Sequence, residues 1–150
     1  MAKKIVAQVG VDITGKEKAE MMRRAISQYN LALKNGFFLE ATTLMESLIC
    51  NRLESRLTEL TNREVKMDVL GSLCTNVIKS GEKDNELLKI IDEIIIWKDQ
   101  RNEVLHEAAK IGKGQKKTWE KYLVFAEETA EEGREIYDRF NRRLQKIRKK

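Results

Sequence analysis

The only histidine of the chain, His106, follows Arg101 and Asn102 in the segment WKDQRNEVLHEAAK, residues 97 to 110. A histidine can take or give a proton near neutral pH, an arginine can hold a phosphate by two parallel hydrogen bonds, and an asparagine can orient either group. These residue types suit RNA cleavage without a metal, in which the ribose 2′-hydroxyl attacks its own phosphodiester and cations stabilise the phosphorane. Arg101, Asn102 and His106 are therefore the candidate catalytic residues.

Other kinds of catalysis have little support in the sequence. Neither a paired acidic motif nor a His/Cys cluster has the spacing of metal ligands, so we expect no metal and no other cofactor. The segment GKGQKK, residues 112 to 117, lacks the spacing and the preceding strand of a phosphate-binding glycine loop. Cys50 and Cys74 are interpreted as small buried hydrophobic residues. A Ser or Cys nucleophile paired with His106 stays open, although no motif indicates one.

Composition predicts an all-α protein of one domain. The chain has 150 residues, of which 41% are hydrophobic and 35% are charged, and it contains no proline. We expect an up-and-down helical bundle of about five helices over residues 16–150, after a short extended arm over residues 1–15 in which Val and Ile alternate with polar residues. The longest apolar run, residues 94–97, is far shorter than the ~20 residues of a membrane span, and the N-terminus lacks the apolar stretch of a signal peptide. We therefore expect a cytoplasmic protein that does not bind membranes.

Helical periodicity places the five helices at about residues 16–35, 37–60, 64–79, 86–110 and 118 to the basic tail. The third of these is predicted from Val65, Val69, Leu73 and Val77, which recur at four-residue steps. Asp84 or Asn85 is expected to cap the fourth helix, and Gly133 is a possible bend in the fifth. Trp97 and Trp119 are both expected in the core.

The fourth helix must position the candidate catalytic residues. At ~100° per residue, Lys98, Arg101 and Asn102 fall within its apolar arc, together with Leu105 and Ala108, and His106 falls at the edge of the arc.

An inward-facing guanidinium must be compensated, because it cannot lose its charge. Arg101 either reaches solvent or pairs with a carboxylate such as Glu46 or Glu54, or else its face lines a water-filled cleft that takes an anionic ligand.

The spacing of the candidate residues favours a dimer. Arg101 and His106 are five residues apart and point roughly 140° from each other, so one copy of the helix is a poor two-residue catalyst. Two copies across a two-fold axis would gather two Arg, two Asn and two His in one cleft. Ile91 and Ile95 could supply the apolar contact between the copies.

The distribution of basic residues favours contact with a polyanion. The net charge is +5, and the last ten residues hold six basic side chains and no acidic one. Arg52 and Arg56 are secondary candidates for the cleft. The residues expected to hold RNA phosphates are Lys98, the loop residues Lys113, Lys116 and Lys117, and, in the basic C-terminal segment, Arg142 and Arg143.

The segment RNEVLH, residues 101 to 106, resembles the catalytic motif of the HEPN superfamily, in which an Arg and a polar residue precede a His near the end of a helix in a small all-α chain. The resemblance implies a helical, commonly dimeric domain, and many members are metal-independent endoribonucleases of toxin–antitoxin, abortive-infection or CRISPR systems. It also implies that Arg101 and His106 form the catalytic pair, with Asn102 in support, at a composite site on the dimer interface. Toxins silenced by a partner nucleotidyltransferase often carry a Tyr two residues after the His, and Ala108 departs from that pattern.

We therefore expect a homodimeric, metal-independent endoribonuclease that acts on RNA as a toxin or anti-phage defence effector, with an antitoxin or defence-system protein as a further partner. Two alternatives stay open. One is a catalytically inactive helical module that binds a second copy or a partner protein through residues such as Ile95 and Trp97. The other is an RNA binder without catalysis that uses the basic C-terminal segment.

Overall fold

The computed structural model describes residues 15–109 and 118–150, and in these ranges it contains five α-helices and no strand. The all-α fold class predicted from composition is confirmed. Residues 1–14 of the expected arm, together with Lys113, Lys116 and Lys117, lie outside the described residues. The helices are α2 (Gly15–Lys34), α3 (Phe38–Thr61), α4 (Leu70–Lys79), α5 (Asn85–Ala109) and α6 (Trp119–Arg148).

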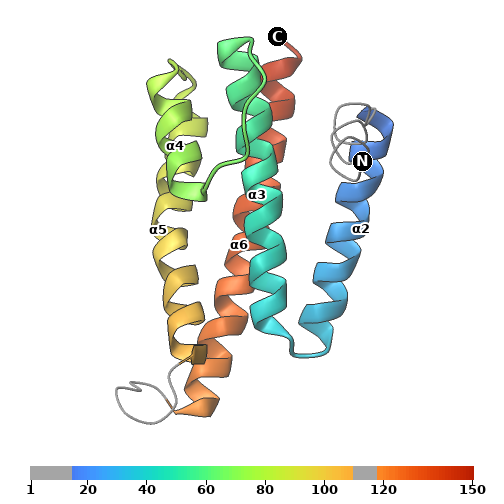
Figure 1. Cartoon of the computed structure of the whole chain (residues 1–150), viewed down its shortest axis with the longest axis vertical. Helices are drawn as coiled ribbons and strands as arrows, with labels where there is room; N and C mark the ends of the chain where they lie inside the picture. Colours follow the sequence, from blue (N-terminus) through green and yellow to red (C-terminus); the bar gives the residue numbers. More distant parts are fainter. Residues whose placement is uncertain (1–14, 110–117) are drawn as a thin grey trace, which may run out of the picture.

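The four long helices, α2, α3, α5 and α6, lie side by side and alternate in direction (Figure 1). α6 packs against both α3 and α5, and α2 packs against α3. The short helix α4 packs against α3 and α5, beside the first part of α5 (Figure 1). The bundle is therefore up-and-down, with α4 as an additional helix that runs antiparallel to α5.

Most helix ends follow their sequence signals. Gly36, with φ 76°, lies in the turn between α2 and α3, where a residue without Cβ adopts the left-handed conformation at low cost. Asp84 Oδ2 accepts the backbone N–H of Leu87 at 3.0 Å, so the carboxylate caps α5 as predicted.

The predicted start of the third helix is wrong. Residues 64–69 are not helical, and α4 begins at Leu70. A strict four-residue step drifts by ~40° per step around a helix, so Val65 and Val77 would lie ~120° apart and could not share one buried face. Leu73 and Val77 are fully buried, whereas Val69 is exposed and the half-buried Val65 reaches the core from the connection.

Among residues 15–109 and 118–150, no helix combines the length and the apolar composition that a membrane crossing requires.

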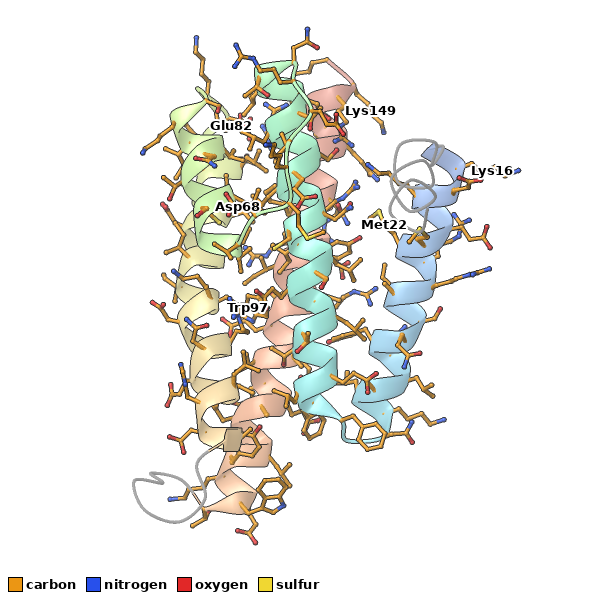
Figure 2. All side chains as sticks on the ribbon, in the orientation of Figure 1. Lys16, Met22, Asp68, Glu82, Trp97 and Lys149 are labelled. Carbon is orange, nitrogen blue, oxygen red and sulfur yellow. The ribbon has the colours of Figure 1, made fainter. Side chains whose placement is uncertain are left out.

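The core is centred on Trp97 of α5, which lies inside the bundle (Figure 2) and has no solvent exposure. Its indole N–H donates to the backbone carbonyl of Thr129 on α6 at 2.8 Å. A Cβ atom at Gly133 would lie 2.7 Å from Cζ2 of the Trp97 ring, closer than real contacts allow. Gly133, where we expected a bend, therefore makes room for this ring, and α6 continues as one helix from Trp119 to Arg148.

Gly133→Ala is expected to lower the free energy of unfolding by ~1–3 kcal/mol, because the added methyl group overpacks against Trp97. The higher helix propensity of alanine offsets at most ~1 kcal/mol of this cost. Urea unfolding of the wild type and the variant measures the difference. The cost should shrink when Trp97 is replaced by the smaller Phe, and an equal cost in that background would contradict the contact.

The prediction that Trp119 lies in the core is wrong. Trp119 is 61% exposed and stacks on Tyr122, with ring centroids 5.3 Å apart. It is the first residue of α6, whose first turns extend past the N-terminal end of α3 (Figure 1), so α3 does not cover it.

An ion pair joins the start of α5 to α6. Arg143 donates from Nε to Asp84 Oδ2 at 2.7 Å and from Nη2 to Asp84 Oδ1 at 2.5 Å. These hydrogen bonds to the Arg143 guanidinium lower the pKa of Asp84 to about 2. The capping carboxylate of α5 is thus held in its ionised form.

Asp84→Asn is expected to lower the free energy of unfolding near pH 6, since the amide can still cap α5 but cannot form the ion pair. The folded-state pKa lies below the unfolded value of about 3.9. The stabilisation is therefore complete above that value and is lost as the pH falls through about 2. Urea unfolding at pH 6, 4 and 3 should show the two proteins converging at low pH, and a constant difference would argue against the ion pair. Asp84→Ala, which also removes the cap, should cost a further ~1 kcal/mol.

Candidate active site

The buried residues of α5 recur every seven residues, so they do not stay at one angle on a helical wheel drawn at ~100° per residue. The fully or nearly fully buried apolar residues are Leu87, Ile90, Ile91, Ile94, Trp97 and Val104. Such spacing drifts by ~20° per seven residues relative to an ideal helix. Arg101 occupies the position of Leu87 and Ile94 in this repeat, and His106 falls on another face.

This drift changes where several residues of α5 lie. Asn102 and Leu105 are half-buried, and Ala108 is exposed, although the sequence placed all three within the apolar arc. His106, expected at the edge of the arc, is exposed. The end of α5 therefore presents His106 to solvent while Arg101 points into the bundle.

Arg101 pairs with a carboxylate on a neighbouring helix. Its Nη2 lies 2.9 Å from Oε1 of Glu46 on α3, and its side chain is only 15% exposed. Of the two carboxylates considered from the sequence, Glu46 is the partner. The Nε atom of Arg101 is buried and makes no hydrogen bond among the described residues. The ion pair holds the guanidinium in place without satisfying all of its donors.

Arg101 also lines an open hollow of about 710 Å³ between α4 and α5, called here the α4–α5 hollow. Its cationic side chains are Lys79, Lys98 and Arg101, and its carboxylate is Asp68, in the connection that leads into α4 (Figure 2). The hollow is completed by Val69, Leu70, Gly71, Ser72, Thr75 and Asn76. Arg101 is thus paired inside the chain, as the first alternative predicted, and it also borders a polar hollow.

A single chain does not bring Arg101 and His106 onto one face. Arg101 contacts α3, whereas His106 is exposed on the last turn of α5. The two side chains of one chain therefore lie on different faces of α5, which agrees with the angular separation expected from their spacing.

The basic residues expected to bind RNA divide into two groups. Lys98 is half-buried beside Arg101, whereas Arg142 is exposed and lines a separate hollow of about 360 Å³ between α5 and α6, with Lys89 and Lys146. Residues 89 and 106 are ~25 Å apart along α5, so this second hollow is remote from His106.

Arg143 is not a free phosphate ligand, because it is held by Asp84 and Glu86. The prediction that Arg143 binds RNA did not take these two carboxylates into account. Asp84 directly precedes α5 and Glu86 lies in its first turn, and both contact Arg143 on α6.

The secondary candidates on α3 do not line the α4–α5 hollow. Arg56 donates to Glu82 from Nε and Nη2 at 2.5 and 2.9 Å, and so ties α3 to the turn before α5. Arg52 is half-buried, donates to Asn51 at 2.8 Å, and has a buried Nε without a hydrogen-bond partner among the described residues.

The exposed apolar residue of α5 differs from those expected at a dimer contact. Ile91 is fully buried, so it cannot contact a second copy, and Ile95 is half-buried. Ile96 is 61% exposed and is the apolar side chain that α5 offers to a partner. Trp97 is likewise unavailable to a partner protein.

The cysteines do not offer an activated nucleophile. Both are free thiols, and Cys74 is buried while Cys50 is half-buried. Burial raises the pKa of Cys74 to about 12 and that of Cys50 to about 11, which disfavours the reactive thiolate. No group of three or more His, Cys, Asp or Glu side chains that could hold a metal ion occurs in the part of the chain that the structure describes.

Comparisons of the chain with protein-family models, with curated proteins and with solved structures found no significant match.

Proposed function

We propose that the chain is a metal-independent, HEPN-type endoribonuclease whose composite active site forms across a homodimer. The observation that carries the proposal is the arrangement at the end of α5. The largely buried Arg101 borders a polar, cationic hollow, and His106 is exposed five residues later on the same helix. This arrangement supports the proposal because it provides an arginine at the edge of a polar hollow and an exposed histidine, the two residue types that the reaction needs.

The residues have distinct roles in the proposed reaction. The guanidinium of Arg101 holds the non-bridging oxygens of the scissile phosphate and stabilises the charge of the phosphorane. One His106 removes the proton of the 2′-hydroxyl, whose oxygen attacks phosphorus as the bond to the 5′ oxygen breaks. The second copy of His106, as imidazolium, protonates the departing 5′ oxygen. The products are a 2′,3′-cyclic phosphate and a 5′-hydroxyl.

The remaining polar residues act on the catalytic pair. Asn102, half-buried one helical turn before His106, orients the phosphate or the imidazole. Glu46 is a positioning residue, because its contact with Nη2 fixes the direction in which the Arg101 guanidinium points.

The homodimer is needed because one chain separates its own Arg101 and His106. Exposed Ile96 and half-buried Ile95 offer apolar surface for the contact between two copies of α5. We further propose that the enzyme works in the cytoplasm as a toxin or defence effector, restrained by an antitoxin or defence-system partner.

The test is incubation of the purified protein with labelled RNA in excess EDTA, with analysis of the product ends and of the molar mass in solution. We expect cut RNA with cyclic phosphate ends, from a protein with the mass of a dimer. Failure to cleave a broad panel of RNAs would overturn the enzymatic proposal.

A second candidate function is binding without catalysis, of RNA or of a partner protein. The ion pair between Arg101 and Glu46 favours it, because an arginine with a purely structural role would be held in the same way. RNA affinity that falls steeply with salt, without cut products, would identify the non-catalytic RNA binder.

A further inference from the structure

The Lys98 side chain passes close to Gly71, at the start of α4. A Cβ atom at Gly71 would stand 3.3 Å from Nζ of Lys98 and 3.7 Å from its Cδ. The aliphatic stem of the lysine therefore runs close against the α4 backbone, and the half-buried side chain carries its charge to the α4–α5 hollow.

Arg101 is paired with Glu46, but the two lysines of the hollow have no carboxylate partner among the described residues. Within residues 15–109 and 118–150, neither Lys79 nor Lys98 forms an ion pair, whereas most arginines of the bundle do. The carboxylate of Asp68 accepts the backbone N–H of Val69 at 2.7 Å. The hollow thus keeps an excess of positive charge beside Arg101.

The polar side chains of α4 that line the hollow form a row. Ser72, Thr75, Asn76 and Lys79 follow the spacing of one helix face and extend over ~10 Å. The Thr75 hydroxyl donates to the Gly71 carbonyl at 3.1 Å, so the available donors are the Ser72 hydroxyl, the Asn76 amide and the Lys79 ammonium. Donors in a row suit a chain of phosphates and sugars better than one small anion.

We propose that the α4–α5 hollow binds the single-stranded RNA that flanks the scissile bond, with Lys98 on the phosphate next to the one held by Arg101 and Lys79 on a phosphate further along α4. The identity of the strand rests on the proposed function. Lys98 and Lys79 are positioning residues that set the affinity for RNA and do not take part in proton transfer.

The test measures binding separately from cleavage. A fluorescent single-stranded RNA oligonucleotide is titrated by anisotropy, in EDTA and in the His106→Ala background, at several salt concentrations. Lys98→Met keeps the aliphatic stem and removes the charge, and Lys79→Met does the same on α4. Lys34→Met is the matched control, since exposed Lys34 ends α2, which packs on the other side of α3 (Figure 1).

Lys98→Met and Lys79→Met should each raise the Kd about 5- to 10-fold and reduce the slope of log affinity against log salt by ~0.7, the loss of one single-strand phosphate contact. Lys34→Met should change neither by much. Unchanged affinity and slope in the hollow variants would overturn the inference, even if the wild type cleaves RNA. Weaker binding in these variants, with no cleavage by the wild type, would support RNA binding in the α4–α5 hollow and overturn the nuclease proposal.

Thr75→Glu provides a second test that does not disturb the packing of Lys98. Thr75 is exposed on α4, so the variant adds a negative charge to the hollow at little structural cost. It should weaken RNA binding at least as much as Lys79→Met, and full affinity in this variant would also overturn the inference.

Discussion

His106→Ala is expected to lower the rate of RNA cleavage by ~10²- to 10⁴-fold, because a positioned acid or base contributes that much to proton transfer. His106 is exposed, so its loss should leave the unfolding midpoint and the dimer unchanged. Single-turnover cleavage in EDTA, with circular dichroism and molar mass on the same samples, measures all three. Cleavage that persists in His106→Ala at the wild-type rate would reject His106 as the catalytic residue.

Arg101 needs a control that separates catalysis from structure, because it also pairs with Glu46. Arg101→Met and Glu46→Gln both remove the ion pair, but only the first removes the guanidinium. If Arg101 holds the phosphate, Arg101→Met should lose cleavage. Glu46→Gln should keep most of it, because its amide oxygen can still accept from Nη2 and position the guanidinium. If the two variants lose stability and activity to the same degree, the role of Arg101 is structural.

Trp97→Ala is expected to lower the free energy of unfolding by ~3–5 kcal/mol, a large part of the ~5–15 kcal/mol that stabilises a typical domain. The substitution empties the fully buried ring position beside Gly133 and leaves the Thr129 carbonyl without the indole donor. Urea unfolding followed by circular dichroism measures the loss without relying on tryptophan fluorescence.

Trp119→Ala is the matched control for this substitution. Trp119 is 61% exposed, so removing the same side chain there should change stability by no more than ~0.5 kcal/mol. Similar losses for the two variants would contradict the assignment of Trp97 to the core and Trp119 to the surface.

Local patterns in the sequence were enough to predict the helical class, most helix ends and the candidate residues. The helical spacing of apolar residues specifies a helix and, approximately, the face that it buries, since both depend on neighbours within a few turns. The Asp84 cap is local in the same sense. That Arg101 requires compensation also follows from its place on the stripe and from the permanent charge of the guanidinium.

Contacts between residues distant in sequence were decided only by the tertiary structure. The choice of Glu46 as partner of Arg101, the engagement of Arg143 by Asp84, and the hollow that joins Lys79 to Lys98 all depend on how helices approach one another. The exposure of Trp119 depends on where α3 begins relative to the first turns of α6. His106 is exposed because the buried face of α5 shifts gradually around the helix axis along its length. Packing of α5 against α6 sets this shift, and a helical wheel drawn at ~100° per residue does not include it.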